Sequence, residues 1–192
     1  MKGVAIVLAA CAALAAGCAS TAPARFYTLS VETPQAPAAQ GPSIAVAAVT
    51  VPDTVDRPQL VVAVNANEVI ILEQHRWAEP LKGELARVLA ENLSRASGNA
   101  RVAAYPQNAS LNANYRVLVD FQRFAGHPEG DVVLDVLWSV RAKDGERLRR
   151  GRSSARESAG KGYDALVAAY SRALATLARE IAAALKELPE AE

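Results

Sequence analysis

Cysteine is almost absent from this chain, and histidine is scarce. Cys11 and Cys18 stand near the amino terminus, and no cysteine follows them. The rest of the chain therefore forms no disulfide and no thiolate metal site. The two histidines, His75 and His127, lack the spacing of a zinc-binding helix. These absences predict a protein that uses no metal or cofactor and takes its stability from an apolar core.

Sequence signatures of catalysis are also missing. No G-x-S-x-G pattern marks the nucleophile of an α/β-hydrolase. The pair Gly160-Lys161 resembles a phosphate-binding loop only superficially, because Gly162 replaces the required Ser or Thr and Ala155 replaces the first Gly. We therefore expect no catalytic residues and a protein that is not an enzyme.

Neither sign of charge is in excess. The chain has 21 Lys and Arg and 20 Asp and Glu, and removal of Lys2 with a signal peptide makes the two equal. A mature chain without net charge argues against nucleic acid as a general partner. Its hydrophobic content of 51% is ample for one core, so a single domain is expected.

The amino terminus reads as a lipoprotein signal peptide. Its apolar run, Val4–Ala16, is shorter than the roughly 20 residues that span a bilayer. The run ends in Leu14-Ala15-Ala16-Gly17-Cys18, where small residues precede a cysteine that can accept lipid. Cleavage before Cys11 would leave a signal with hardly any hydrophobic stretch. We predict a signal peptide over 1–17 and lipid attachment at Cys18, with a plain secretory signal as the alternative.

A short lipidated tether over 18–25 follows the signal peptide, and it precedes a domain over 26–188 and a tail over 189–192. The tether reaches roughly 25 Å at most, which keeps the domain close to the membrane. Ala19 and Ser20 lack the aspartate that commonly holds lipoproteins in the inner membrane. We therefore predict a lipid-anchored protein on the periplasmic face of the outer membrane.

Hydrophobic periodicity predicts an α/β (α+β) fold. Helices are expected from Pro80 to Gly98 and from Tyr163 to Leu188. Asp144-Gly145 is the strongest hairpin signal. Regular βαβ alternation is lacking, so we predict one domain with a mixed, largely antiparallel sheet and two main helices packed on it. The expected strands are 25–31, 43–51 (apolar enough to be covered on both faces), 59–64, 68–74, 101–105, 114–124, 131–143 and 146–157.

Four short motifs resemble the ABC-type transport auxiliary lipoprotein family, whose best-known type serves the Pqi membrane-integrity system. They are Phe26-Tyr27-Thr28-Leu29, the stretch from Val51 to Val61 (VPDTVDRPQLV), Arg76-Trp77-Ala78-Glu79-Pro80-Leu81, and Tyr105-Pro106. Thr54-Val55 departs from the bulkier pair that is common in the family. The resemblance spans most of the mature chain.

This resemblance implies a non-catalytic docking component of an MCE-type lipid transporter at the outer membrane. Its implied partners are a periplasmic MCE-domain protein and inner-membrane transporter components. Two alternatives stay open: a structural envelope lipoprotein that binds another outer-membrane assembly, and a direct lipid carrier.

The matched motifs supply the candidate partner contacts. Each also has a structural interpretation: Asp56 caps its turn or pairs with Arg57, and Trp77 locks the first helix onto the sheet. The candidate contacts are Asp53, Asp56, Arg57, Gln59, Arg76, Trp77 and Glu79.

Two further stretches have alternative roles. The stretch 141–161 is rich in basic residues, which is typical either of a solvated edge hairpin or of a surface for anionic headgroups. The second helix is rich in alanine, which suits core packing or contact with a second copy in a homo-oligomer.

Overall fold

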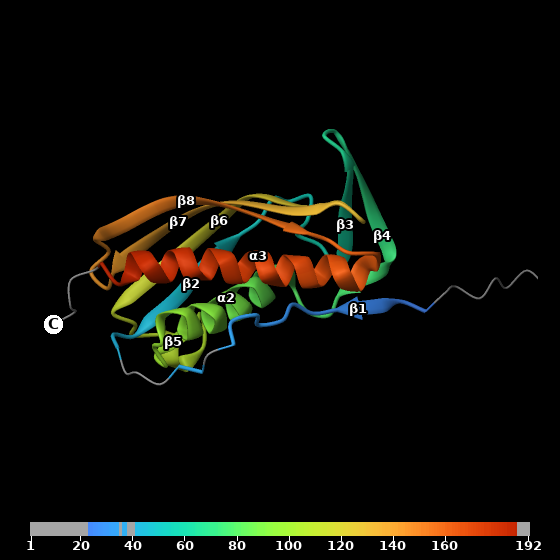
Figure 1. Cartoon of the computed structure of the whole chain (residues 1–192). Helices are drawn as coiled ribbons and strands as arrows, with labels where there is room; N and C mark the ends of the chain where they lie inside the picture. The colour runs from blue at the N-terminus through green and yellow to red at the C-terminus, as the bar shows by residue number, and fades with distance from the viewer. Residues whose placement is uncertain (1–22, 35, 38–40, 188–192) are drawn as a thin grey trace, which may run out of the picture.

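Two long helices lie against one face of a five-stranded sheet (Figure 1). The computed structural model describes residues 23–34, 36–37 and 41–187. Helix α2 spans Leu81–Ser97 and helix α3 spans Gly162–Leu185. The helices contact each other, α2 covering strands β2 and β5 and α3 covering β7 and β8.

The large sheet has the order β5-β2-β6-β7-β8. Its long members, β6, β7 and β8, form an antiparallel meander in which the turn at Asp144-Gly145 joins the last two strands, as predicted. Beside them, β2 pairs in parallel with β5 and β6. The strands are β2 Ile44–Thr50, β5 Val102–Ala104, β6 Tyr115–Gly126, β7 Asp131–Ala142 and β8 Arg147–Ser158.

A second sheet has the order β1-β4-β3 and lies at one end of the domain. Strand β1 spans Arg25–Tyr27, β3 spans Gln59–Asn65 and β4 spans Glu68–Trp77. Strands β3 and β4 form the predicted hairpin, which projects beyond the body of the domain (Figure 1). Strand β1 pairs in parallel with the base of β4.

The expected class is confirmed: a mixed α/β domain in which two helices pack on the strands. The strands divide into two sheets, however, where the sequence suggested one, and the pairings of β1, β2 and β5 are parallel. Strand β2 is covered on both faces only over Ile44–Val46, and alternate residues in its remainder are exposed to solvent.

The residues predicted to begin and end the first helix do so in the structure. Pro80 stands directly before α2, and Gly98 ends it in the left-handed conformation at φ 72°, its N–H donating to the Arg95 carbonyl. The apolar faces of both helices form one core together with side chains of β6 and β7. The fully or nearly fully buried residues include Leu85, Leu89 and Leu93 of α2, Leu166, Leu174, Leu177 and Ile181 of α3, and Val117, Val119, Leu134 and Val140 of the sheet.

Several predictions concern residues outside the described part of the chain. These are the signal peptide, lipid attachment at Cys18, most of the tether and the tail over 189–192. Within the described residues, no helix combines the length and hydrophobicity needed to cross a membrane.

Candidate partner-binding cleft

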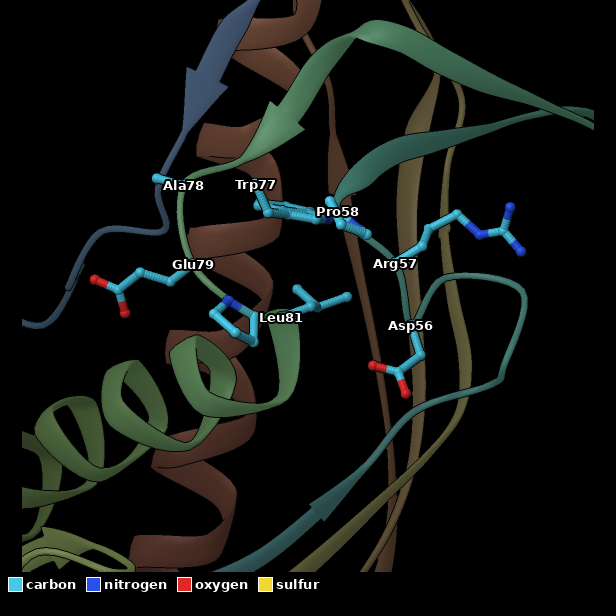
Figure 2. Close-up of a pocket in the computed structure, with 8 residues that line it drawn as sticks. Asp56, Arg57, Pro58, Trp77, Ala78, Glu79 and Leu81 are labelled. Carbon is cyan, nitrogen blue, oxygen red and sulfur yellow. The ribbon is translucent and has the colours of Figure 1, made fainter.

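Two of the sequence motifs meet at one cleft at the base of the β3–β4 hairpin (Figure 2). The loop before β3 and the segment between β4 and α2 are joined by a hydrogen bond of 2.7 Å from the Trp77 amide to the Pro58 carbonyl. Behind them, the Ala78 amide donates to the Tyr27 carbonyl over 2.8 Å. The cleft has a volume of about 340 Å³ and is lined by Asp56, Arg57, Pro58, Trp77, Ala78, Glu79, Pro80 and Leu81.

Trp77 forms the floor of the cleft and is only 5% exposed. Its ring contacts Phe124 and Tyr170 edge-on at centroid distances of 6.4 and 6.3 Å. Those two rings stack on each other at 4.3 Å. Trp77 is thus structural, as one interpretation predicted, but its ring contacts join β4 to β6 and α3, where that interpretation had it lock the first helix onto the sheet. Ala78, Glu79 and Pro80 are the exposed residues beside it.

Charge at the cleft is mixed. Asp56 pairs with Lys82 of α2 over 2.6 Å, not with Arg57 as one interpretation expected, because the first turn of α2 brings the ammonium group alongside the loop. The Arg57 guanidinium points away from Trp77 and Leu81 (Figure 2). Glu79 lies 4.0 Å from Arg87. The cleft therefore has an apolar floor and an exposed rim of both signs.

The remaining candidate contacts are not part of this cleft. Gln59 and Arg76 face each other across β3 and β4, and both side chains bond Glu73: Gln59 Nε2 donates to the carboxylate over 3.2 Å and Arg76 Nε to the carbonyl over 3.0 Å. Asp53 is exposed on the loop before β3 but does not line the cleft. Of the seven candidate contacts, four therefore line the cleft and three lie around it. The four are Asp56, Arg57, Trp77 and Glu79, and the three are Asp53, Gln59 and Arg76.

The cleft is lined by two carboxylates, Asp56 and Glu79, one guanidinium, Arg57, and five apolar residues. Its eight lining residues include no His, Cys, Ser, Thr or Lys that could act as nucleophile or general base in the usual pairings. In the described part of the chain, no three His, Cys, Asp or Glu residues are grouped to hold a metal ion. The arrangement suits contact with a small apolar group of another protein.

A family model for the ABC-type transport auxiliary lipoprotein component matches residues 27–182. The chain belongs to this family. The family is one of transport auxiliary components and is not defined by an enzymatic activity. Comparison of the auxiliary lipoprotein with curated proteins finds no match.

Two solved structures share the fold of the auxiliary lipoprotein. One, titled an uncharacterized protein, covers 85% of this chain and 99% of its own, with 21% identity and a TM-score of 0.68. The other, from Xanthomonas campestris, covers 83% of this chain and 93% of its own, with 17% identity and a TM-score of 0.68. Similarity at this identity shows the fold alone.

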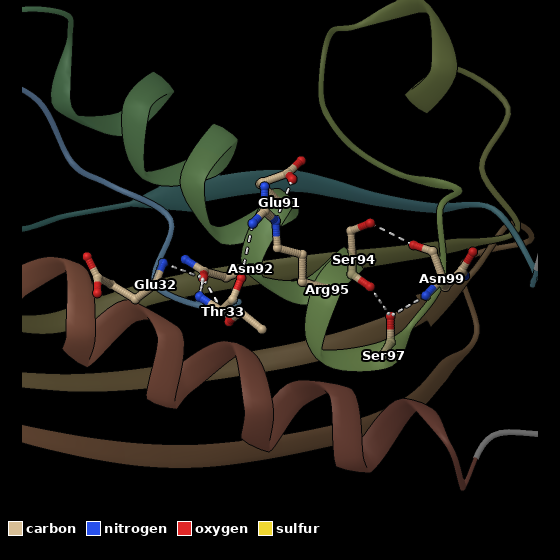
Figure 3. A network of polar contacts seen from close by, with 8 residues as sticks. All are labelled: Glu32, Thr33, Glu91, Asn92, Ser94, Arg95, Ser97 and Asn99. Atoms are coloured by element: carbon tan, nitrogen blue, oxygen red, sulfur yellow. Dashed lines mark hydrogen bonds and ion pairs between the residues drawn. The ribbon is translucent and has the colours of Figure 1, made fainter. Parts of the chain in front are cut away.

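The segment that follows β1 is fastened to α2 by buried side chains. Glu84 is fully buried, and its Oε1 accepts hydrogen bonds from the Leu29 amide at 2.7 Å and the Thr28 hydroxyl at 2.5 Å. About two turns further along α2, Asn92 Oδ1 accepts hydrogen bonds from the amides of Glu32 and Thr33, each at 3.1 Å (Figure 3). The chain that leads from the predicted lipid anchor is therefore held rigidly on the domain.

The basic stretch 141–161 is divided between two faces of the sheet. Arg149 lies near Glu187 at the end of α3, on the face that the helices cover. Arg141, Arg150 and Arg152 line a groove on the face that the helices leave open. Arg156 alternates onto this same open face of β8, where it pairs with Asp131 over 2.8 Å. The stretch is thus neither a uniform edge nor a single patch.

Sequence reasoning missed the buried polar residues Glu84 and Asn92. Both were assigned to α2 but neither was singled out, because a lone Glu or Asn on a helix is normally solvated. The usable signal is their place on the apolar face of α2, in line with Leu81, Leu85 and Leu89.

Proposed function

We propose that the auxiliary lipoprotein is anchored in the outer membrane through Cys18 and docks an MCE-type lipid transporter through the cleft at Asp56–Pro58 and Trp77–Leu81. Its partner is a periplasmic MCE-domain protein that connects to the inner-membrane transporter. The protein would supply a fixed docking point, and other subunits would supply the energy.

The observation that carries this proposal is the convergence of two family-like motifs on one cleft. They lie about twenty residues apart in the sequence, yet the loop before β3 and the junction before α2 share a hydrogen bond and line one depression. An apolar centre with an exposed charged rim is the usual anatomy of a protein-binding spot.

The position of the cleft also favours docking near a membrane. The cleft adjoins β1 through the bond between Ala78 and Tyr27, and β1 follows the predicted acylated cysteine by about seven residues. A tether of that length reaches roughly 25 Å. A partner bound at the cleft would therefore be held beside the leaflet that exchanges lipid.

Affinity capture from solubilised membranes tests the proposal. The variant A78R fills the cleft with a long charged side chain, and A183R makes the same change at an exposed alanine of α3 as the matched control. We expect the wild type and A183R to retain an MCE-domain protein and A78R to lose it. Equal retention by A78R would overturn the assignment of the cleft.

Two other outcomes would replace the proposal itself. If acylated wild type retains no MCE-domain protein but retains another outer-membrane assembly, the structural envelope role holds instead. If the purified protein carries bound lipid through detergent exchange, it is a direct carrier.

A further inference from the structure

Of the large apolar residues in the described structure, Phe26 of β1 is the most exposed. Its side chain is 65% exposed, whereas the next residue, Tyr27, is 7% exposed and faces the core. The register pairs Phe26 with Arg76 and Tyr27 with Trp77, so Phe26 and Arg76 share the outer face of the second sheet. A single exposed apolar residue needs no explanation by itself. What matters here is the position of Phe26 in the chain.

Phe26 is the first large apolar residue after the predicted lipid anchor. Seven residues separate it from Cys18, and Arg25 is the only charged residue among them. A chain of that length reaches roughly 25 Å. Acylation of Cys18 therefore holds the Phe26 ring at a high effective concentration beside the lipid surface, and no carboxylate in the tether opposes its approach to lipid phosphates.

Strand β1 is firmly joined to the rest of the domain. The Tyr27 hydroxyl lies 2.7 Å from His75 Nδ1 of β4. Directly after β1, the amide of Leu29 donates to the buried carboxylate of Glu84 in α2 over 2.7 Å. Because β1 is bonded in this way to a strand and to a helix, a contact made by Phe26 fixes the orientation of the whole domain.

The charges beside Phe26 suit the phosphate groups of a lipid surface. Arg25 precedes it and is exposed, and the neighbouring Arg76 side chain of β4 is 40% exposed. One carboxylate, that of Glu73, lies 3.8 Å from the Arg76 guanidinium. Basic residues next to an exposed aromatic ring are typical of protein surfaces that lie in the headgroup region, with the ring at the boundary of the acyl chains.

We propose that Phe26 inserts into the periplasmic leaflet of the outer membrane beside the acyl chains of Cys18, with Arg25 at the lipid phosphates. This second contact rests on the anchoring in the proposed function but not on docking at the cleft. An acyl anchor alone lets the domain rotate about its tether, whereas the added contact holds one face toward the leaflet. Since Tyr27 is bonded to Ala78 at the cleft, the opening of the cleft is then held in a fixed direction.

Quenching of tryptophan fluorescence by brominated lipid tests the insertion. Acylated F26W is placed in single-copy nanodiscs of phosphatidylethanolamine and phosphatidylglycerol, brominated on their acyl chains near the headgroups. The matched control is Y105W, because Tyr105 is 55% exposed and follows β5, toward the other end of the domain from β1 (Figure 1). Above the wild-type emission of Trp77 and Trp138, we expect quenching at least about twofold stronger in F26W than in Y105W. Equal quenching would overturn the proposal.

Charge reversal tests the part played by Arg25. In the F26W protein, R25E should lower the quenching because it brings a carboxylate to the lipid phosphates. The control K143E, at the exposed β7–β8 turn, should leave the quenching unchanged. Unchanged quenching in R25E would overturn the contact of Arg25 with phosphate. Far-ultraviolet circular dichroism checks that each variant folds.

The design separates this proposal from the proposed function. A nanodisc that holds one copy and no other protein reports contact with lipid alone, so the result does not depend on an MCE-domain partner. Absence of quenching in folded F26W that mass spectrometry shows to be acylated would overturn the insertion and leave docking at the cleft standing. A native protein without acyl chains would overturn both.

Discussion

Asn92 offers the sharpest test of how the chain leading from the anchor is held on the domain. Its Oδ1 accepts three hydrogen bonds: from the Glu32 amide, from the Thr33 amide and, over 2.9 Å, from the Thr33 hydroxyl. Asn92 is fully buried and Thr33 is 8% exposed. The substitution N92A leaves buried donors without an acceptor, which costs about 1–3 kcal/mol for each group.

We expect the loss of stability in N92A to be smaller than the sum of the costs for the three donors. Asn92 Nδ2 is itself buried without a partner among the described residues, and N92A removes that penalty. We therefore expect N92A to lower the free energy of unfolding by about 2–3 kcal/mol. Hydrogen exchange should show that the amides of Glu32 and Thr33 lose protection while α3 keeps its own.

The neighbouring residue provides the control. Glu91 pairs with Arg95 over 2.8 Å, but its side chain is 45% exposed (Figure 3). Because exposed ion pairs contribute about 0–1 kcal/mol, E91A should change stability little. If N92A costs no more than E91A, or if the Thr33 amide stays protected in N92A, Asn92 does not hold this segment and the reasoning fails.

Two further predictions concern the core. Burial raises the pKa of the Tyr170 hydroxyl, which also lacks a hydrogen-bond partner in the described structure. The variant Y170F should therefore be no less stable than the wild type at neutral pH. Above about pH 10 the tyrosine ionises in the unfolded chain but stays protonated in the folded one, so urea titrations should show that the wild type loses more stability than Y170F as pH rises. An equal alkaline loss in both proteins would count against this. A Cβ added at Gly151 would overlap the Trp138 ring, whereas one at Gly83 meets nothing within 4 Å. Calorimetry should therefore show G151A destabilised by about 1–3 kcal/mol and G83A stabilised by about 1 kcal/mol. A stable G151A would show that Trp138 can move aside.

The helices and hairpins could be predicted from local sequence because their signals are local. The apolar spacing from Leu81 to Leu93, with Pro80 before and Gly98 after, specifies α2 within a few residues. Asp144-Gly145 specifies its turn in the same way. Strand direction and sheet membership depend on contacts between distant segments, so the parallel pairing of β1 with β4 and the division into two sheets could not be predicted.

The residues of the candidate site could be predicted from the sequence, but the surface that they form together could not. Trp77 was expected to be structural and is buried, because its position before α2 directs it into the core. The pairing of Asp56 with Lys82 depends on how the loop before β3 meets the first turn of α2, which no local pattern encodes. The groove on the open face of the large sheet likewise requires β7 and β8 in register, since Arg141 and Arg152 are eleven residues apart yet both line it.

Photo-crosslinking in intact cells tests the central claim most directly. A photoreactive residue in place of the exposed Glu79 stands at the rim of the cleft, and the same residue in place of Asp144 stands on the β7–β8 turn, outside the cleft. The account predicts that position 79 cross-links to an MCE-domain protein and that position 144 does not. Cross-linking of the MCE-domain protein from position 144 alone, or from neither position in cells where the lipoprotein is acylated and abundant, would contradict docking through this cleft.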